Sequence, residues 1–290
     1  MSNQLLPFLL PQRGVRGFAV EISEGIPELL GWRNYPPDVV SLLGEVLAAT
    51  PLLAADMREA GRFNIQFQGK GALKLLVTQV DHELRLRGMA KCDEKAAGDF
   101  QQLMGGGMLA CLLESRRERS HDYQAVVEVL GESLAESLQI YFHQSVQMPS
   151  LVRLAASPGK LAGLMLQRLP EGAGQQSENW LHVNHLFSTL KPAELLADEA
   201  QRLLQKLFAE DEVRVFEPRP ITLACQCSHA GISAMLLGLG EDELKPVLEE
   251  KGRVEVTCEF CGRTYSYPDI EVRELFAAAS TAPGQQTLLN

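Results

Sequence analysis

Apolar and polar residues alternate along several stretches of the first 170 residues, which is the pattern of strands that bury one face. Residues 62–68 alternate in this way, Gly69-Lys70-Gly71 supplies a turn, and residues 73–80 resume a β-rich run. Together these stretches predict a hairpin. Further strands are predicted over residues 122–130, 151–155 and 161–169.

Apolar residues recur at helical spacing in three other stretches. Residues 38–58 predict one or two helices, with Pro51 at the start of the second. Ser133-Leu134-Ala135-Glu136 has the form of a capping box, so a helix is expected after Ser133. Residues 193–209 predict a third helix with an apolar stripe. The stripe consists of Leu196, Ala200, Leu203 and Leu207. It belongs either to an ordinary core or to a face that docks loosely on the first domain and can be uncovered.

The same pattern divides the chain into three parts of an α+β protein. Residues 171–178 contain no large apolar side chain and predict a linker. We expect a mixed α/β core domain with β-sheets over residues 1–174 and a helical linker domain over residues 175–222. A small C-terminal domain follows over residues 223–290. It is predicted to contain helices over 231–240 and 241–250, strands over 253–257 and 264–267, and a last helix over 268–279.

Composition narrows the classes of protein that fit this pattern. The chain has 290 residues, 46% of them hydrophobic, so the fold as a whole can bury enough core without a metal. A formal net charge of −10 argues against a broad nucleic-acid-binding face, which needs clustered Lys and Arg. No apolar run approaches the roughly 20 residues that cross a bilayer, so no membrane partner is expected. Residues 5–11 are apolar but carry two prolines and no basic leader, which argues against a signal peptide.

Four of the six cysteines lie in the last quarter of the chain, as Cys225-x-Cys227 and Cys258-x-x-Cys261. Two close pairs at this separation suit one tetrahedral Zn²⁺, with each pair supplying two thiolates. Such a site is closed, which disfavours Lewis-acid catalysis. Each pair also offers an oxidant a ready disulfide partner. Spacing alone leaves two roles open, a structural brace and a switch. Thiols in metal-ligand spacing, without a signal peptide, indicate a reducing, cytoplasmic location.

The remaining histidines and cysteines predict no second site. His229 follows Cys227 closely, but four thiolates already complete the coordination sphere, so a surface role or one next to the ligands is expected. His182 and His185 would share a helix face without any acidic or thiol partner nearby in sequence. Cys111 lies in an apolar run and is expected to be buried, whereas Cys92 lies in a charged stretch and is expected to be exposed.

No catalytic constellation is recognisable, and the chain is not expected to be an enzyme. Gly105-Gly106-Gly107 lacks the rest of a phosphate-binding loop and predicts a turn or close backbone packing. Ser133 falls short of the G-x-S-x-G elbow and is better explained as a helix cap.

Longer motifs around the cysteines are similar to those of a known family. They are Phe216-Glu217-Pro218-Arg219-Pro220, Cys225-x-Cys227-Ser228 and Val256-Thr257-Cys258-Glu259-Phe260-Cys261-Gly262. With segments such as Gln66-Phe67-Gln68-Gly69-Lys70-Gly71, they make nearly the whole chain resemble the bacterial 33 kDa chaperonin family, redox-regulated heat-shock chaperones. Met104-Gly105-Gly106-Gly107-Met108 matches least well.

The resemblance implies a holdase that binds unfolding client proteins without ATP and prevents their aggregation under heat and oxidative stress. In the family the reduced form is inactive and holds one Zn²⁺ on four thiolates, here Cys225, Cys227, Cys258 and Cys261. Oxidation would pair Cys225 with Cys227 and Cys258 with Cys261, and zinc would be released. The resemblance further implies that the redox-switch domain, residues 223–290, and the adjoining linker then unfold, and that the activated protein is a homodimer.

Two other functions fit parts of the sequence. A constitutive structural zinc ribbon that binds nucleic acid or the transcription machinery would account for the cysteines, but the acidic balance disfavours it. A thiol–disulfide oxidoreductase that uses Cys258 and Cys261 would need a thioredoxin-like βαβ context, which the surrounding sequence lacks.

Overall fold

Contacts group the chain into two units, Met1–Ala224 and Cys225–Asn290. The computed structural model describes residues 3–57, 60–115, 123–170 and 176–281. Both units combine helices with sheets, which confirms the predicted α+β class.

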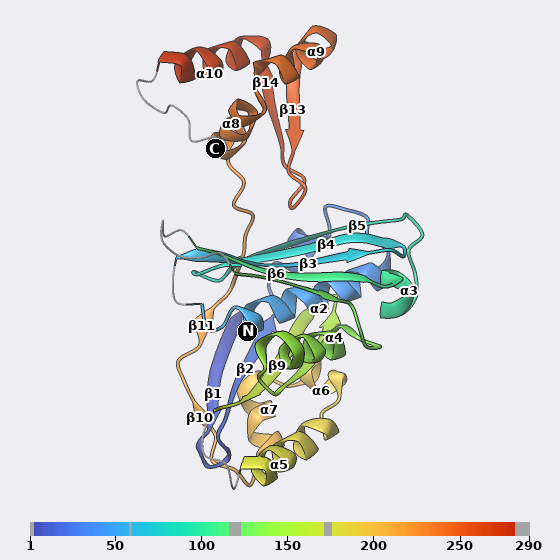
Figure 1. Cartoon of the computed structure of the whole chain (residues 1–290), viewed down its shortest axis with the longest axis vertical. Coiled ribbons are helices and arrows are strands. Elements are labelled where there is room, and N and C mark those ends of the chain that lie inside the picture. The colour runs from blue at the N-terminus through green and yellow to red at the C-terminus, as the bar shows by residue number, and fades with distance from the viewer. Residues whose placement is uncertain (1–2, 58–59, 116–122, 171–175, 282–290) are drawn as a thin grey trace. The chain divides into compact units, whose positions relative to one another are not determined.

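The first sheet of the N-terminal unit is entirely antiparallel, in the order β10-β1-β2-β9-β8, with β11 also paired to β1 (Figure 1). A short 3₁₀ turn, η1 (Pro11–Arg13), joins its first two strands. The strands are β1 (Gln4–Leu10), β2 (Val15–Ile22), β8 (Ser150–Ser157), β9 (Lys160–Arg168), β10 (Arg214–Val215) and β11 (Arg219–Pro220). The strands predicted over 151–155 and 161–169 are thereby confirmed.

The second sheet has the order β12-β5-β4-β3-β6-β7, in which β12 runs parallel to β5 and the other pairs are antiparallel. The predicted hairpin is β3 and β4, and the strand predicted over 122–130 is β7, although residue 122 lies outside the described residues. The strands are β3 (Gly61–Gly69), β4 (Leu73–Asp81), β5 (Arg85–Cys92), β6 (Gly107–Ser115), β7 (Tyr123–Glu128) and β12 (Thr222–Leu223).

Helix α2 (Pro37–Leu53) packs against strands of both sheets and forms the centre of the unit. The prediction that Pro51 starts a second helix is wrong, because Pro51 lies inside the last turn of this single helix. The missing proline N–H costs one helical hydrogen bond. Neighbours such as Leu47 and Leu52, both 0% exposed, hold the turn in the core all the same. Residue 58, the end of the predicted stretch, lies outside the described residues.

Helix α4 (Leu134–Tyr141) begins where the capping motif predicts. Ser133 Oγ accepts the N–H of Glu136 at 3.2 Å, while the Glu136 carboxylate accepts the N–H of Glu132 at 2.7 Å. A turn of π-helix, η2 (Phe142–Val146), continues it. Two further short helices complete this part of the unit, α1 (Ile26–Leu30) and α3 (Phe100–Met104).

The glycine run after α3 is a backbone turn, as predicted. Gly105 has a φ of +58°, and a Cβ there would lie 2.6 Å from the Gly71 nitrogen. The N–H groups of Lys70 and Gly71 both donate to the Met104 carbonyl at 2.8 Å. Close contact between two backbone segments therefore accounts for these glycines.

Three helices cover the face of the first sheet that points away from α2 (Figure 1). They are α5 (Gln176–Thr189), α6 (Pro192–Ala197) and α7 (Ala200–Leu207). The prediction of one continuous helix over 193–209 is wrong, because the backbone is extended at Asp198 and Glu199.

Side chains of the sheet satisfy the polar backbone groups exposed by this break. Lys160 Nζ donates to the Asp198 carbonyl at 2.5 Å, and the Ala200 N–H donates to Glu21 Oε1 at 2.8 Å. Lys160 and Glu21 also form an ion pair at 3.0 Å. This clasp explains how two short helices replace the single helix.

The linker predicted over 171–178 is corrected in part. Residues 171–175 lie outside the described residues, and residues 176–178 begin α5. The polar composition of this stretch suggested a linker, but α5 is a helix that buries few of its side chains, among them Val183 and Phe187. The contact grouping keeps α5 to α7 with the N-terminal unit, and the three-part division at residues 174 and 222 stays a prediction.

Residues 225–281 of the C-terminal unit contain a two-stranded antiparallel sheet and three helices, close to the predicted elements (Figure 1). They are α8 (His229–Leu239), α9 (Glu241–Lys251), β13 (Arg253–Thr257), β14 (Thr264–Pro268) and α10 (Asp269–Thr281). Its core of buried apolar residues is small: Leu236, Leu244, Val254, Tyr265, Tyr267 and Val272. Among the described helices of the chain, none has both the length and the apolar character that a membrane span requires.

Glu45 of α2 lies beside a cavity of about 280 Å³ that is also lined by Asp38, Asp99 and Glu132. Burial raises the pKa of the Glu45 carboxyl from 4.5 to about 7. The folded protein therefore favours the protonated form. The stability that this group contributes is fully present below pH 4.5 and is lost as the pH rises through about 7.

The substitution E45Q keeps this side chain neutral at every pH. We expect E45Q to exceed the wild type in free energy of unfolding by on the order of 2 kcal/mol at pH 8, with a gap that closes toward pH 5. Chemical denaturation at both pH values measures the gap. E128Q, which removes an exposed carboxylate of β7, is the control. A gap of equal size at both pH values would contradict the effect of burial on Glu45.

Candidate metal centre

Two short loops of the C-terminal unit carry the four clustered cysteines. Cys225 and Cys227 lie between β12 and α8, and the Ser228 side chain caps α8 by accepting the Gly231 N–H at 3.1 Å. Cys258 and Cys261 lie in the turn between β13 and β14. That turn closes through the Gly262 N–H, which donates to the Cys258 carbonyl at 2.9 Å, and Gly262 has a φ of +70°.

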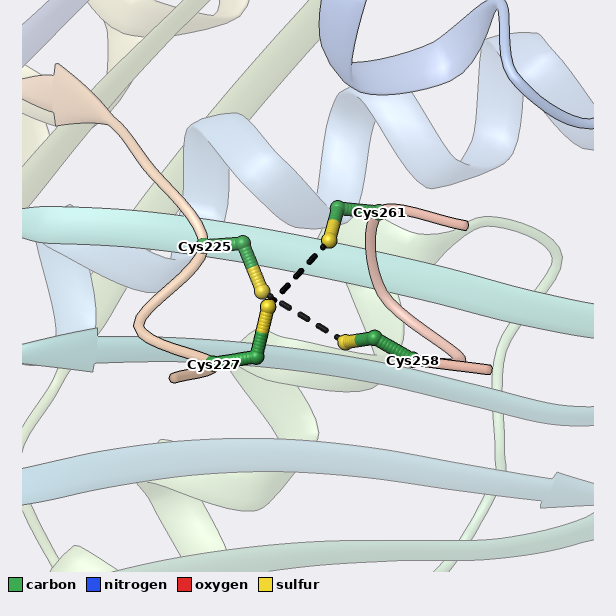
Figure 2. A group of neighbouring side chains, drawn as sticks. All are labelled: Cys225, Cys227, Cys258 and Cys261. Atoms are coloured by element: carbon green, nitrogen blue, oxygen red, sulfur yellow. Dashed lines mark hydrogen bonds between the residues drawn. The ribbon is translucent and has the colours of Figure 1, made fainter. Parts of the chain in front are cut away.

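The two loops point their sulfur atoms toward one another (Figure 2). The Sγ atoms of Cys225 and Cys258 are 3.6 Å apart, those of Cys227 and Cys261 are 3.4 Å apart, and all four lie within 4.8 Å of one another. Tetrahedral Zn²⁺ with Zn–S bonds of about 2.3 Å requires sulfur separations of about 3.8 Å. The four thiols therefore fit one such ion. No other group of three or more close His, Cys, Asp or Glu ligands occurs among the described residues.

Burial dominates the electrostatics of Cys258 and Cys261. Burial, together with hydrogen bonds among the neighbouring sulfurs, raises the pKa of Cys261 to about 12, against the lowering effect of the Arg263 backbone N–H. Burial also raises the pKa of Cys258, against the N–H groups of Phe260 and Cys261. A cation among the sulfurs would reverse this preference, because a coordinating thiol is deprotonated.

Aromatic side chains of β14 line the same core as the cysteines. The Tyr265 hydroxyl donates to Cys227 Sγ at 3.2 Å, a contact that the sequence does not predict. The alternation of Tyr265 and Tyr267 in a strand next to the cysteine turn is the signal that would have placed both on the core face. His229 stacks on Tyr267 with ring centroids 4.6 Å apart, and its Nε2 lies 3.1 Å from Glu271 Oε1. The imidazole of His229 therefore interacts with Tyr267 and Glu271 and is not one of the clustered ligands.

The other candidate residues lie elsewhere in the fold. Cys111 of β6 is 0% exposed, as predicted, and burial raises its pKa to about 12. Cys92 ends β5 and is half-buried, whereas the sequence predicts an exposed side chain, because its strand packs against the core. His182 contacts the buried carboxylate of Asp211 at 3.3 Å, and His182 and His185 form no metal-ligand group. None of the six cysteines forms a disulfide in this structure.

Comparison with known proteins identifies the family. A model of the family described as "Hsp33 protein" matches residues 3–268. The chain belongs to the Hsp33 family. Similar curated relatives are the "33 kDa chaperonin" of Shewanella loihica, 38% identical over 99% of this chain and 100% of the relative, and that of Nitrosococcus oceani, 36% identical over 99% of each. A crystal structure of the 33 kDa chaperonin of Thermotoga maritima superimposes with a TM-score of 0.84, at 22% identity, over 97% of this chain and 100% of the other.

Membership of the Hsp33 family confirms the resemblance seen in the sequence and assigns the chain to the chaperones. Its relatives are named chaperonins, which are generally not enzymes. Because the Thermotoga protein is only 22% identical in sequence, its structure supports the fold and nothing further.

The fit of the four sulfurs leads to a prediction about metal content. We expect the reduced protein to bind about one Zn²⁺ per chain, and we expect Cys258→Ser to weaken binding by more than about 100-fold. The reason is that loss of a mere outer-shell partner already costs about 10- to 100-fold. Competition with a chromophoric chelator measures the affinity, with Cys92→Ala as the matched control. Full zinc affinity in the Cys258→Ser protein would contradict the four-thiolate site.

Proposed function

We propose that this protein is a redox-regulated, ATP-independent holdase. In the reduced, inactive form Cys225, Cys227, Cys258 and Cys261 would hold one Zn²⁺. Oxidation of the four thiols activates the chain, which then binds unfolding clients in the cytoplasm under heat or oxidative stress and acts as a homodimer. The observation that carries the proposal is the convergence of four cysteine sulfurs within 4.8 Å in a unit with a small apolar core.

The small core makes the C-terminal unit dependent on its cysteines. Six buried apolar residues are few for a unit that includes three helices and a hairpin. When bound, Zn²⁺ would supply folding free energy, on the order of 10 kcal/mol in zinc-finger peptides. The thiolates that hold the metal are also the species that peroxides oxidise. One set of side chains can therefore sense the oxidant and stabilise the fold.

Oxidation within each cysteine pair consumes the whole ligand set. Two thiols lose two electrons and two protons when a disulfide forms, and one hydrogen peroxide accepts them to become two water molecules. Disulfides Cys225–Cys227 and Cys258–Cys261 would leave no covalent link between the two loops. Bonds between the loops, across the 3.4 and 3.6 Å contacts, would instead keep them joined. Pairing within each loop is the outcome that a releasing switch requires.

The segment that leads into the cysteine loop is weakly held. Among the described residues after α7, the strands that pair with the two sheets are β10, β11 and β12, each two residues long. The N–H groups of Thr222 and Ala224 donate to carbonyls of β5 and the turn before it at 3.1 Å. Such short pairings cost little to open. Unfolding of the C-terminal unit can therefore spread along the chain toward α7.

Detachment of the helices would uncover a client-binding surface. The face of the first sheet under α5 to α7 is apolar, with Leu6, Phe8, Leu10, Val15, Leu164 and Leu166 buried there. The helices contribute matching apolar residues, such as Leu203, Leu204 and Phe208. Either face would present contiguous apolar area once separated, which is the property that binds unfolded chains.

Suppression of client aggregation tests this proposal. We expect the reduced protein to leave a thermally unfolding client unprotected, and we expect peroxide at mildly elevated temperature to make suppression nearly complete without ATP. Light scattering measures the aggregation. The matched control is the C92A/C111A double variant, which keeps the four clustered cysteines and is expected to respond like the wild type. Equal suppression before and after oxidation, with zinc retained in both states, would contradict the switch.

A further inference from the structure

Tyr265 is the residue of β14 that contacts the sulfur group directly. Its side chain is buried, and its hydroxyl donates a hydrogen bond to Cys227 Sγ at 3.2 Å. It pairs with Val256 of β13 in the hairpin that carries Cys258 and Cys261. The phenol therefore ties the second cysteine loop, through its strand, to a sulfur of the first loop.

Arg263 is a hydrogen-bond partner of this phenol. Its exposed side chain shares a hydrogen bond with Tyr265 and interacts electrostatically with Cys227 and Cys261. Because a guanidinium only donates, the hydrogen bond runs from Arg263 to the phenolic oxygen and leaves the phenolic hydrogen for Cys227. The guanidinium thereby fixes the orientation of the phenol and strengthens its hydrogen bond to the sulfur.

Backbone N–H groups donate hydrogen bonds to two other sulfurs of the cluster. Cys258 accepts from the N–H groups of Phe260 and Cys261, and Cys261 accepts from that of Arg263. Those bonds are built into the turn. The bond to Cys227 comes from a side chain, so a single hydroxyl sets it and a substitution can remove it without changing the turn.

We propose that Tyr265, supported by Arg263, is a positioning residue that restrains the Cys227 sulfur and lowers its reactivity toward electrophiles and hydroperoxides. A lone pair engaged by the phenol is less available for attack, as outer-shell partners of metal-bound groups tune their ligands. This inference rests on the proposed function for its biological meaning, since it makes Tyr265 a determinant of how much oxidant the switch needs.

The reaction that the phenol restrains is simple. The Cys227 sulfur attacks one oxygen of a hydroperoxide, the O–O bond breaks, and the sulfur becomes a sulfenic acid while water or an alcohol leaves. The neighbouring thiol then displaces the sulfenic hydroxyl as water and forms the disulfide. Loss of the phenolic hydrogen bond accelerates the first step at Cys227 and leaves the first step at Cys258 unchanged.

Two tyrosines of the same strand provide a matched comparison. Tyr265→Phe removes the hydroxyl that meets Cys227. Tyr267→Phe removes a hydroxyl from the same face of β14 whose hydrogen bonds go instead to the His229 carbonyl at 2.9 Å and the Ser233 hydroxyl at 3.2 Å. Arg263→Gln removes the cation from an exposed position, so it keeps the inference testable even if Tyr265→Phe fails to fold.

The experiment measures the reactivity of each cysteine in the reduced full-length protein. A short pulse of iodoacetamide, followed by unfolding and an isotope-coded second label, gives an initial alkylation rate for each cysteine by peptide mass spectrometry. We expect Tyr265→Phe to raise the ratio of the Cys227 rate to the Cys258 rate by about tenfold. Arg263→Gln should raise it by less, and Tyr267→Phe should leave it unchanged. An unchanged ratio in both Tyr265→Phe and Arg263→Gln, or an equal rise in Tyr267→Phe, would overturn the inference.

Alkylation keeps this test separate from the proposed function, because it requires no disulfide and no activation. If peroxide fails to activate the wild type while Tyr265→Phe still raises the ratio, the proposed function falls and the role of Tyr265 stands. If the wild type switches normally and the ratio does not move, Tyr265 is only a core residue and the switch stands.

Discussion

Two sulfurs from each of two loops of the C-terminal unit lie within 4.8 Å of one another, and the proposed function depends on this constraint. Three neighbouring features position the two cysteine loops: the cap on α8, the tight turn at Gly262 and the tyrosines of β14. The buried apolar cluster in the described part of this unit has six residues, so a metal ion on the four sulfurs would supply a large share of the unit's folding free energy. Because cysteine sulfurs can be oxidised and reduced again, a unit stabilised through four of them could unfold and refold reversibly.

The N-terminal unit has the opposite character. Two sheets enclose α2, and a second apolar layer lies under α5 to α7, so burial of apolar area is sufficient to hold it. Its outermost layer is fixed to the sheet by the polar clasp of Lys160 and Glu21 as well as by packing. In the function proposed above, this apolar layer under α5 to α7 is the surface that would bind clients once uncovered.

Local patterns predicted much of this structure. The β3–β4 hairpin, the cap at Ser133 and the helices, strands and cysteine turn of the C-terminal unit all follow from residues adjacent in the sequence. Long-range contacts decided the rest. The break at Asp198 depends on Lys160 and Glu21, and the sulfur contact of Tyr265 depends on how two distant loops meet. Spacing alone could suggest four ligands but could not show that their sulfurs converge.

We propose that the same four thiols sense the oxidant and hold the C-terminal unit folded. The most direct measurement follows zinc release, free thiols and amide hydrogen exchange over residues 225–281 in one sample after addition of peroxide. We predict that about four thiols are lost for each zinc released and that exchange protection in this unit disappears at the same rate, while α2 stays protected. Loss of the four thiols with zinc retained and protection unchanged would contradict the account.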